Sequence, residues 1–148
     1  MRKMQGMVMV EFAIVGAALM MVIFGCLEFG RATYSLAALN EGTRRAARLA
    51  AVCPINDPVI VPAVNFMGVN GFSASDVTLN YLDANGTVLA GTPASSSVYY
   101  VQVSVGGSIP LAIPLLNTAV SPSFTVTLPA ESVGITIAAD GSGVLTPC

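Results

Sequence analysis

The chain has 148 residues, of which 54% are apolar and only 9% are charged. In soluble domains roughly a quarter of all residues are charged, so part of this chain is expected to lie in lipid or against partners. All basic residues lie between Arg2 and Arg48, and the acidic remainder could not bind a phosphate backbone, which argues against a nucleic-acid partner.

The sequence also lacks the residue patterns of catalysis. Histidine, the commonest general base and metal ligand, is absent. The glycine-rich pieces at 68–71 and 106–108 lack the lysine of a phosphate loop and are predicted to be turns, and the carboxylates are scattered. We therefore expect a protein that is not an enzyme, with no catalytic residue, cofactor, metal or small-molecule substrate.

An apolar segment at residues 7–27 predicts a transmembrane helix. Its positions are nearly all apolar, with Glu11 as the one charge. As a helix it would be about 31 Å long, close to the roughly 30 Å hydrocarbon thickness of a bilayer. The segment exceeds the 7 to 15 apolar residues, roughly, of an ordinary signal peptide.

The helical pattern continues through residues 28–53 as an amphipathic extension. No proline occurs before Pro54, so one helix of about 46 residues is expected. Its charged face carries one acid and three bases at spacings that allow i,i+3 and i,i+4 ion pairs: Glu41, Arg44, Arg45 and Arg48. Its opposite, narrow face, which we expect to lie against a sheet, comprises Leu39, Ala46, Ala50 and Cys53.

Residues 54–148 are predicted to form an exported β-rich domain. Apolar and polar residues alternate at 77–81, at 99–105 and at 124–128, and residues 83–86 supply a hairpin turn before 87–89. A helical turn is expected at 64–67, and an edge strand at 133–137. The fold class is therefore α+β, a long N-terminal helix packed on a small antiparallel sheet.

The first residues resemble a type III prepilin processing site. A basic leader at 1–6 ends in Gly6, and Glu11 and Phe12 would become the fifth and sixth residues after cleavage before Met7. The resemblance implies cleavage by a prepilin peptidase, an N-terminus in the cytoplasm, and assembly roles for Glu11 and Phe12. The alternatives are an uncleaved signal anchor with an incidental glycine, and a Glu11 whose charge is compensated only by its own helix N-terminus.

Two further segments resemble the TadE-like family, namely Leu27-Glu28-Phe29-Gly30-Arg31 and the Ala-Ala-Arg run at 46–48. Beyond residue 50 the resemblance is loose and includes the link at 109–116. It implies a pilin-like minor pilin or pseudopilin that helps to assemble a Flp-type adhesive pilus with other pilins and an assembly platform. The candidate partner contacts are Glu28, Arg31, Arg44, Arg45 and Arg48; a solvated helix face is the alternative for the last three.

The positions of the cysteines predict different roles for them. Cys53 at the helix end and Cys148 are expected to form a disulfide in an oxidising compartment. Cys26, at the end of the apolar segment, is expected to be a free thiol that behaves as a small apolar side chain. Residues 22–26 are also lipobox-like, which leaves a lipid-modified Cys26 as an alternative.

These features predict a protein of the bacterial inner membrane, with its C-terminal domain in the periplasm or, within a pilus, at the cell surface. Two other functions stay open. One is a membrane-tethered periplasmic binding module that is never assembled, and the other is a lipoprotein that begins at Cys26.

Overall fold

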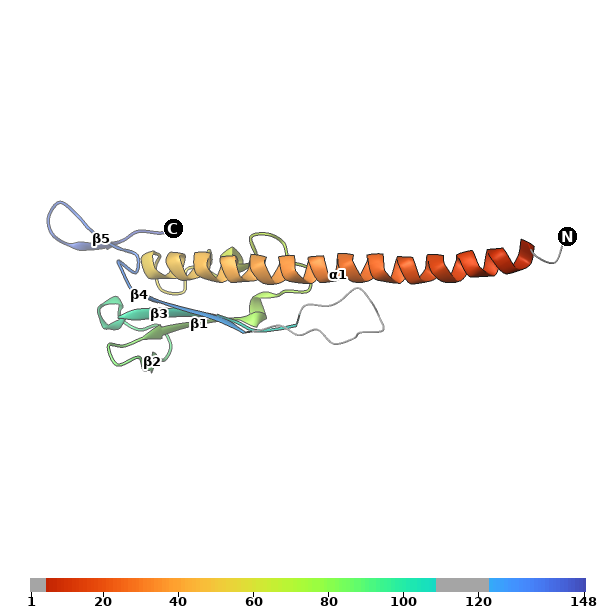
Figure 1. Ribbon diagram of the computed structural model, residues 1–148. Coiled ribbons are helices and arrows are strands. Elements are labelled where there is room, and N and C mark those ends of the chain that lie inside the picture. The colour runs from red at the N-terminus through yellow and green to blue at the C-terminus, as the bar shows by residue number, and fades with distance from the viewer. Residues whose placement is uncertain (1–4, 109–122) are drawn as a thin grey trace.

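The structure, a computed structural model, describes residues 5–108 and 123–148. The helix α1 (Gln5–Val52) has its C-terminal half on one face of a small antiparallel sheet, and its N-terminal half projects beyond the sheet (Figure 1). The predicted α+β class is confirmed. Most of the leader, residues 1–4, and the link at 109–116 lie outside the described residues.

The helix α1 is continuous over 48 residues, or about 72 Å. It contains no proline, and its second half is rich in alanine, the best helix former. The last helical bond joins the Cys53 N–H to the Leu49 carbonyl at 2.7 Å. Pro54 then stops the helix, because it lacks an N–H and its ring would clash with the preceding turn.

The main sheet has the strand order β2-β1-β3-β4, and all neighbours are antiparallel. Its strands are β1 (Val77–Leu82), β2 (Val88–Leu89), β3 (Tyr100–Val105) and β4 (Phe124–Pro129). In the central strand β3 the three valines 101, 103 and 105 are fully buried beneath α1, whereas the intervening Gln102 and Ser104 are half-buried. The predicted strands are therefore present as β1, β3 and β4, and burial alternates regularly in β3 and β4.

The predicted hairpin after β1 is also confirmed. One carboxylate oxygen of Asp83 accepts the N–H groups of Asn85 and Thr87, each at 2.8 Å. Gly86 has a φ of 80°, which glycine adopts without steric cost. These features turn the chain back into β2, with Leu82 opposite Val88.

Short 3-10 helices connect these elements: η1 (Pro62–Asn65), η2 (Ala74–Asp76) and η3 (Ser95–Ser97). The helical turn expected at 64–67 corresponds to η1, which begins two residues earlier. Against α1, η1 packs so tightly that a Cβ on Gly42 would lie 1.8 Å from the Val64 carbonyl oxygen. Gly42 is thus required by the close approach of two backbones.

We expect Gly42→Ala to destabilise the domain by about 3 kcal/mol, because the η1 backbone must move to make room for the methyl group. The matched control is Gly30→Ala. A Cβ there meets open space, so the helix should gain up to about 1 kcal/mol of propensity. Denaturant unfolding of both full-length variants in detergent checks this difference. Equal midpoints for the two variants would contradict the predicted contact.

The edge strand expected at 133–137 is wrong as placed. The strand β5 (Ile135–Ile137) instead pairs with β6 (Gly143–Leu145) in a separate two-stranded sheet. Two successive residues with positive φ, Val133 at 46° and Gly134 at 78°, turn the chain away from β4. The N–H of Gly134 then bonds to the Val52 carbonyl at 2.6 Å, so this segment is tied to the end of α1 and not to the sheet edge.

Candidate functional site

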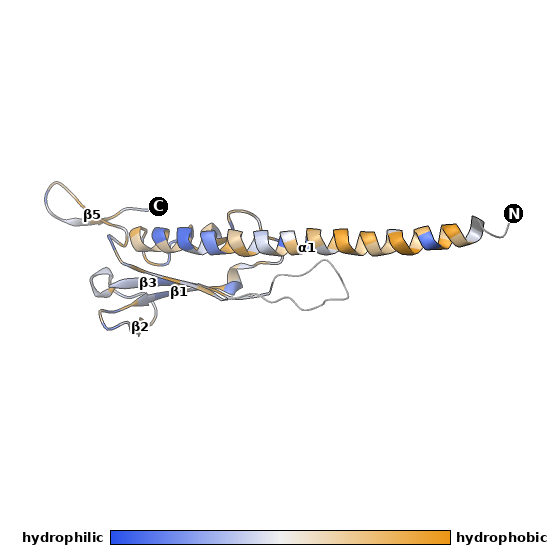
Figure 2. Ribbon diagram, in the orientation of Figure 1, coloured by the Kyte–Doolittle hydropathy of each residue, from blue (hydrophilic) through white to orange (hydrophobic). Residues whose placement is uncertain are grey.

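The N-terminal half of α1 presents an apolar surface on every side. No part of its most apolar window is buried, and Phe12 is 77% exposed. Figure 2 shows apolar colour along this half of the helix and polar colour near its other end. By length and composition this helix could cross a membrane.

The predicted processing and assembly residues lie together at the start of this half. Gly6 is in the first turn of α1, and no atom lies within 4 Å of the place where its Cβ would be. Glu11 is exposed one turn after Met7, within about 6 Å of it along the axis. The first N–H groups of a helix lack intrahelical partners and make this end electropositive, but the first turn of α1 has no acidic residue and Glu11 lies in the second turn.

Beyond the apolar half, Glu28 and Arg31 form an i,i+3 ion pair with an N–O distance of 2.7 Å. This hydrogen bond raises the pKa of the Arg31 guanidinium above its ordinary value. The Glu28 side chain is only 11% exposed, whereas that of Arg31 is 41% exposed. The two candidate contact residues thus partner each other within the chain.

The charged face of α1, comprising Glu41, Arg44, Arg45 and Arg48, is exposed on the side of the helix away from the sheet. The spacing of Glu41 and the arginines allows ion pairs, but among the described residues no ion pair joins them. The Arg45 guanidinium instead lies over the Phe66 ring, 4.9 Å from its centroid. A cation over an aromatic ring and an exposed ion pair contribute similar free energies. The position of the Phe66 ring therefore decides which of the two contacts Arg45 makes.

A pocket of about 620 Å³ lies beside this cation–π contact, at the C-terminal end of α1. Its walls are largely apolar, and they comprise Glu41, Arg45, Arg48, Leu49, Val52, Cys53, Phe66 and Cys148. The structure therefore gathers two candidate contact residues, Arg45 and Arg48, with both disulfide cysteines. It leaves Gly6, Met7, Glu11 and Phe12 at the opposite end, with Glu11 about 45 Å from Glu41 along the axis.

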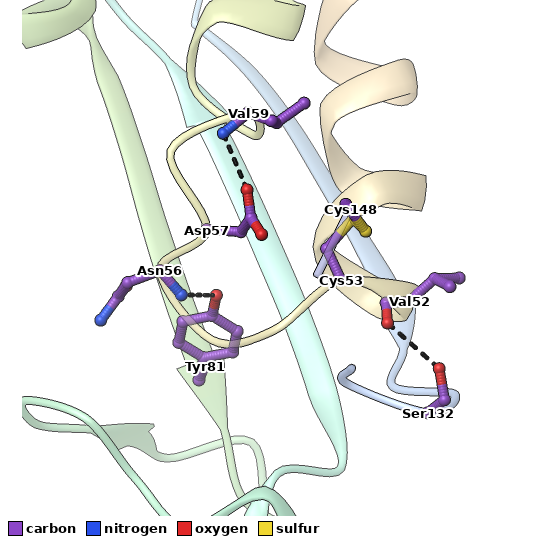
Figure 3. The surroundings of a disulfide bond; sticks show 8 residues. All are labelled: Val52, Cys53, Asn56, Asp57, Val59, Tyr81, Ser132 and Cys148. Atoms are coloured by element: carbon purple, nitrogen blue, oxygen red, sulfur yellow. Dashed lines mark hydrogen bonds between the residues drawn. A yellow bond between two sulfur atoms is a disulfide. The ribbon is translucent and has the colours of Figure 1, made fainter. Parts of the chain in front are cut away.

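Cys53 and Cys148 are joined by a disulfide with a Cα–Cα distance of 5.6 Å (Figure 3). Cys53 is fully buried at the end of α1, and nearby the Ser132 hydroxyl donates a hydrogen bond to the Val52 carbonyl at 3.1 Å. On the other side, the Asn56 N–H donates to the Tyr81 hydroxyl at 2.9 Å. Burial raises the pKa of Tyr81, so its hydroxyl stays neutral. Cys26 is a free, exposed thiol on the apolar half of α1.

Over residues 5–108 and 123–148, no three carboxylates or cysteines come close enough to hold a metal ion. In the described parts of the chain, the candidate residues therefore lie on the apolar half of α1, on its charged face and in the disulfide. Sequence reasoning missed one participant, Phe66, which comes from a segment with no recognisable period.

Comparison with known proteins gives one family match, to the family described as TadE-like protein, over residues 6–48. Neither a curated protein nor a solved structure matches the chain. The matched segment lies wholly within α1 and includes the apolar half, the Glu28–Arg31 pair and the charged face. This family is associated with the membrane and with the tight-adherence pilus machinery. Over residues 6–48, less than a third of its length, the chain is similar to the TadE-like family.

Proposed function

We propose that the chain is a minor pilin or pseudopilin that takes part in assembling a Flp-type adhesive pilus and that performs no catalysis. A prepilin peptidase cleaves it between Gly6 and Met7. Its partners are the inner membrane, this peptidase, other pilins or pseudopilins and the assembly platform.

One observation carries this proposal: the family match coincides with a helix whose apolar half is exposed on every side. Soluble monomers rarely expose apolar patches larger than a few hundred Å². The bilayer can cover this surface while the subunit waits in the membrane, and neighbouring helices can cover it after assembly. Because α1 continues without a break from that surface into the sheet domain, helices packed against the apolar half would also fix the position of the domain.

The proposed topology has the N-terminus in the cytoplasm and the β-rich domain in the periplasm. The Cys53–Cys148 disulfide supports this side for the domain, because disulfides persist in oxidising compartments such as the bacterial periplasm. The charged face then lies outside the bilayer, where a partner in the same compartment can reach it.

The mass of the mature protein tests the processing step. After coexpression with a prepilin peptidase, wild-type protein should lack its first six residues, whereas Gly6→Leu should keep them. Gly25→Leu is the matched control, because it also adds a side chain in open space on the apolar half of α1, and it should be cleaved normally.

An uncleaved N-terminus in wild-type protein would contradict the proposal and favour a membrane-tethered binding module. A lipid-modified chain that begins at Cys26 would favour the lipoprotein. Each outcome has a different mass, so one spectrum of the full-length product separates them.

A further inference from the structure

The segment that follows η1 lies at the end of the β-rich domain toward the apolar half of α1 (Figure 1). There the Tyr34 hydroxyl of α1 donates a hydrogen bond to the Met67 sulfur at 3.8 Å. Both side chains remain exposed. The contact joins residues 33 positions apart, and it places Met67 beside the part of α1 that comes soon after the apolar half.

The position of Tyr34 along α1 sets the distance of this contact from the bilayer. The apolar segment ends at Leu27, and the seven further residues to Tyr34 add about 10 Å of helix. The headgroup layer extends about 5 to 8 Å beyond the hydrocarbon core. Side chains of a helix lean toward its N-terminus, so the Tyr34 side chain leans back toward this layer. Tyrosine is enriched at this depth, because its ring is apolar and its hydroxyl can contact headgroups.

The segment that carries Met67 has a composition that suits a membrane surface. Residues 58–75 contain no charged side chain, so contact with lipid desolvates no charge. Met67 itself is flexible and apolar. Phe29, two residues beyond the apolar segment, is also exposed. A single exposed apolar side chain needs no explanation, but Phe29, Tyr34 and Met67 continue the exposed surface of the apolar half onto the domain.

We propose that the headgroup layer of the bilayer covers an interfacial patch made of Phe29, Tyr34 and Met67, so that the domain rests on the membrane before assembly. The occupant is lipid because the patch is continuous with the surface that spans the bilayer. Interfacial anchors set the direction in which a membrane helix tilts. Met67 lies beside α1, so its contact turns that side of the domain toward the bilayer. This inference rests on the membrane anchoring in the proposed function.

Tryptophan fluorescence tests this contact, because the chain contains no tryptophan and one introduced residue reports a single position. Full-length Met67→Trp, Phe29→Trp and Val59→Trp are reconstituted into phosphatidylcholine vesicles, with and without lipid that carries a nitroxide on its headgroup. Val59 is the matched control. It is 46% exposed, against 45% for Met67, and lies on the same uncharged segment near the disulfide (Figure 3). The nitroxide should quench Met67→Trp and Phe29→Trp several-fold more than Val59→Trp.

A smaller substitution repeats the test. In a Cys26→Ser background, Met67→Cys and Val59→Cys are labelled with a nitroxide, and the Met67 label should be less accessible to a water-soluble relaxant. Peptide mapping that finds Cys53 linked to Cys148 confirms that each variant has folded.

The outcomes separate this inference from the proposed function. If Phe29→Trp is quenched strongly but Met67→Trp only as much as Val59→Trp, water or a partner protein covers Met67. The inference is then overturned while the proposed function stands. If Phe29→Trp is not quenched either, the membrane anchoring is wrong, and the proposed function fails together with the inference.

Discussion

Loss of the Cys53–Cys148 disulfide should lower the free energy of unfolding of the domain by about 4 kcal/mol. The bond joins residues 95 positions apart, and in the chain-entropy model closing so long a loop restricts the unfolded chain by about 4 to 5 kcal/mol. Cys148→Ser is the cleaner variant because Cys148 is exposed, whereas Cys53 is fully buried and its replacement would also place a hydroxyl in the core.

Denaturant unfolding of full-length Cys148→Ser in detergent measures this loss, with Cys26→Ser as the control. Cys26 is exposed and unbonded, so its replacement should leave the midpoint unchanged. Non-reducing peptide mapping of exported wild-type protein should find the Cys53 and Cys148 peptides linked. Two free thiols, or equal midpoints for the two variants, would contradict the expectation.

Glu11→Leu should abolish assembly while leaving insertion and cleavage intact. A carboxylate within the apolar half of α1 is unfavourable in lipid, so the variant inserts at least as well, and Gly6 is unchanged. In an assembled bundle, Glu11 would pair with the freed amine of a neighbouring subunit's first residue. Leucine cannot form that pair, so the subunit should be absent from sheared pili and should not crosslink to pilins.

The matched control for this experiment is Met9→Leu, which places the same residue two positions away at a site that is also exposed. It should assemble normally. If Glu11→Leu also assembles at the wild-type level, Glu11 is compensated by its own helix N-terminus and has no role in assembly.

Long periodic segments made much of this fold predictable. The apolar run and the absence of proline before Pro54 predict α1, and alternation predicts β1, β3 and β4, because a buried face repeats its chemistry at the period of the element. Asp83 and Gly86 predict the turn after β1 through their side-chain and backbone preferences.

The features that the sequence did not predict are contacts between segments that lie far apart in the chain. The contact of Arg45 with Phe66 and the approach of η1 to Gly42 join residues far apart in sequence, so no local period reports them. A glycine inside a helical pattern was a usable signal for the close approach.

The β5–β6 pair was missed for a related reason. It depends on a positive φ at Val133, which a β-branched residue rarely adopts. The turn between the strands did have a signal, namely Asp140, whose carboxylate accepts hydrogen bonds from the N–H and hydroxyl of Ser142. These bonds lower the pKa of Asp140.

In the proposed function, α1 of the mature chain packs against other pilins. A photoreactive amino acid at Met20, on the exposed apolar half of α1, tests it most directly in cells that carry the pilus system. The cleaved chain, beginning at Met7, should crosslink to pilin subunits and should be recovered with sheared filaments. An uncleaved chain that crosslinks only to lipid and stays in the membrane fraction would contradict it.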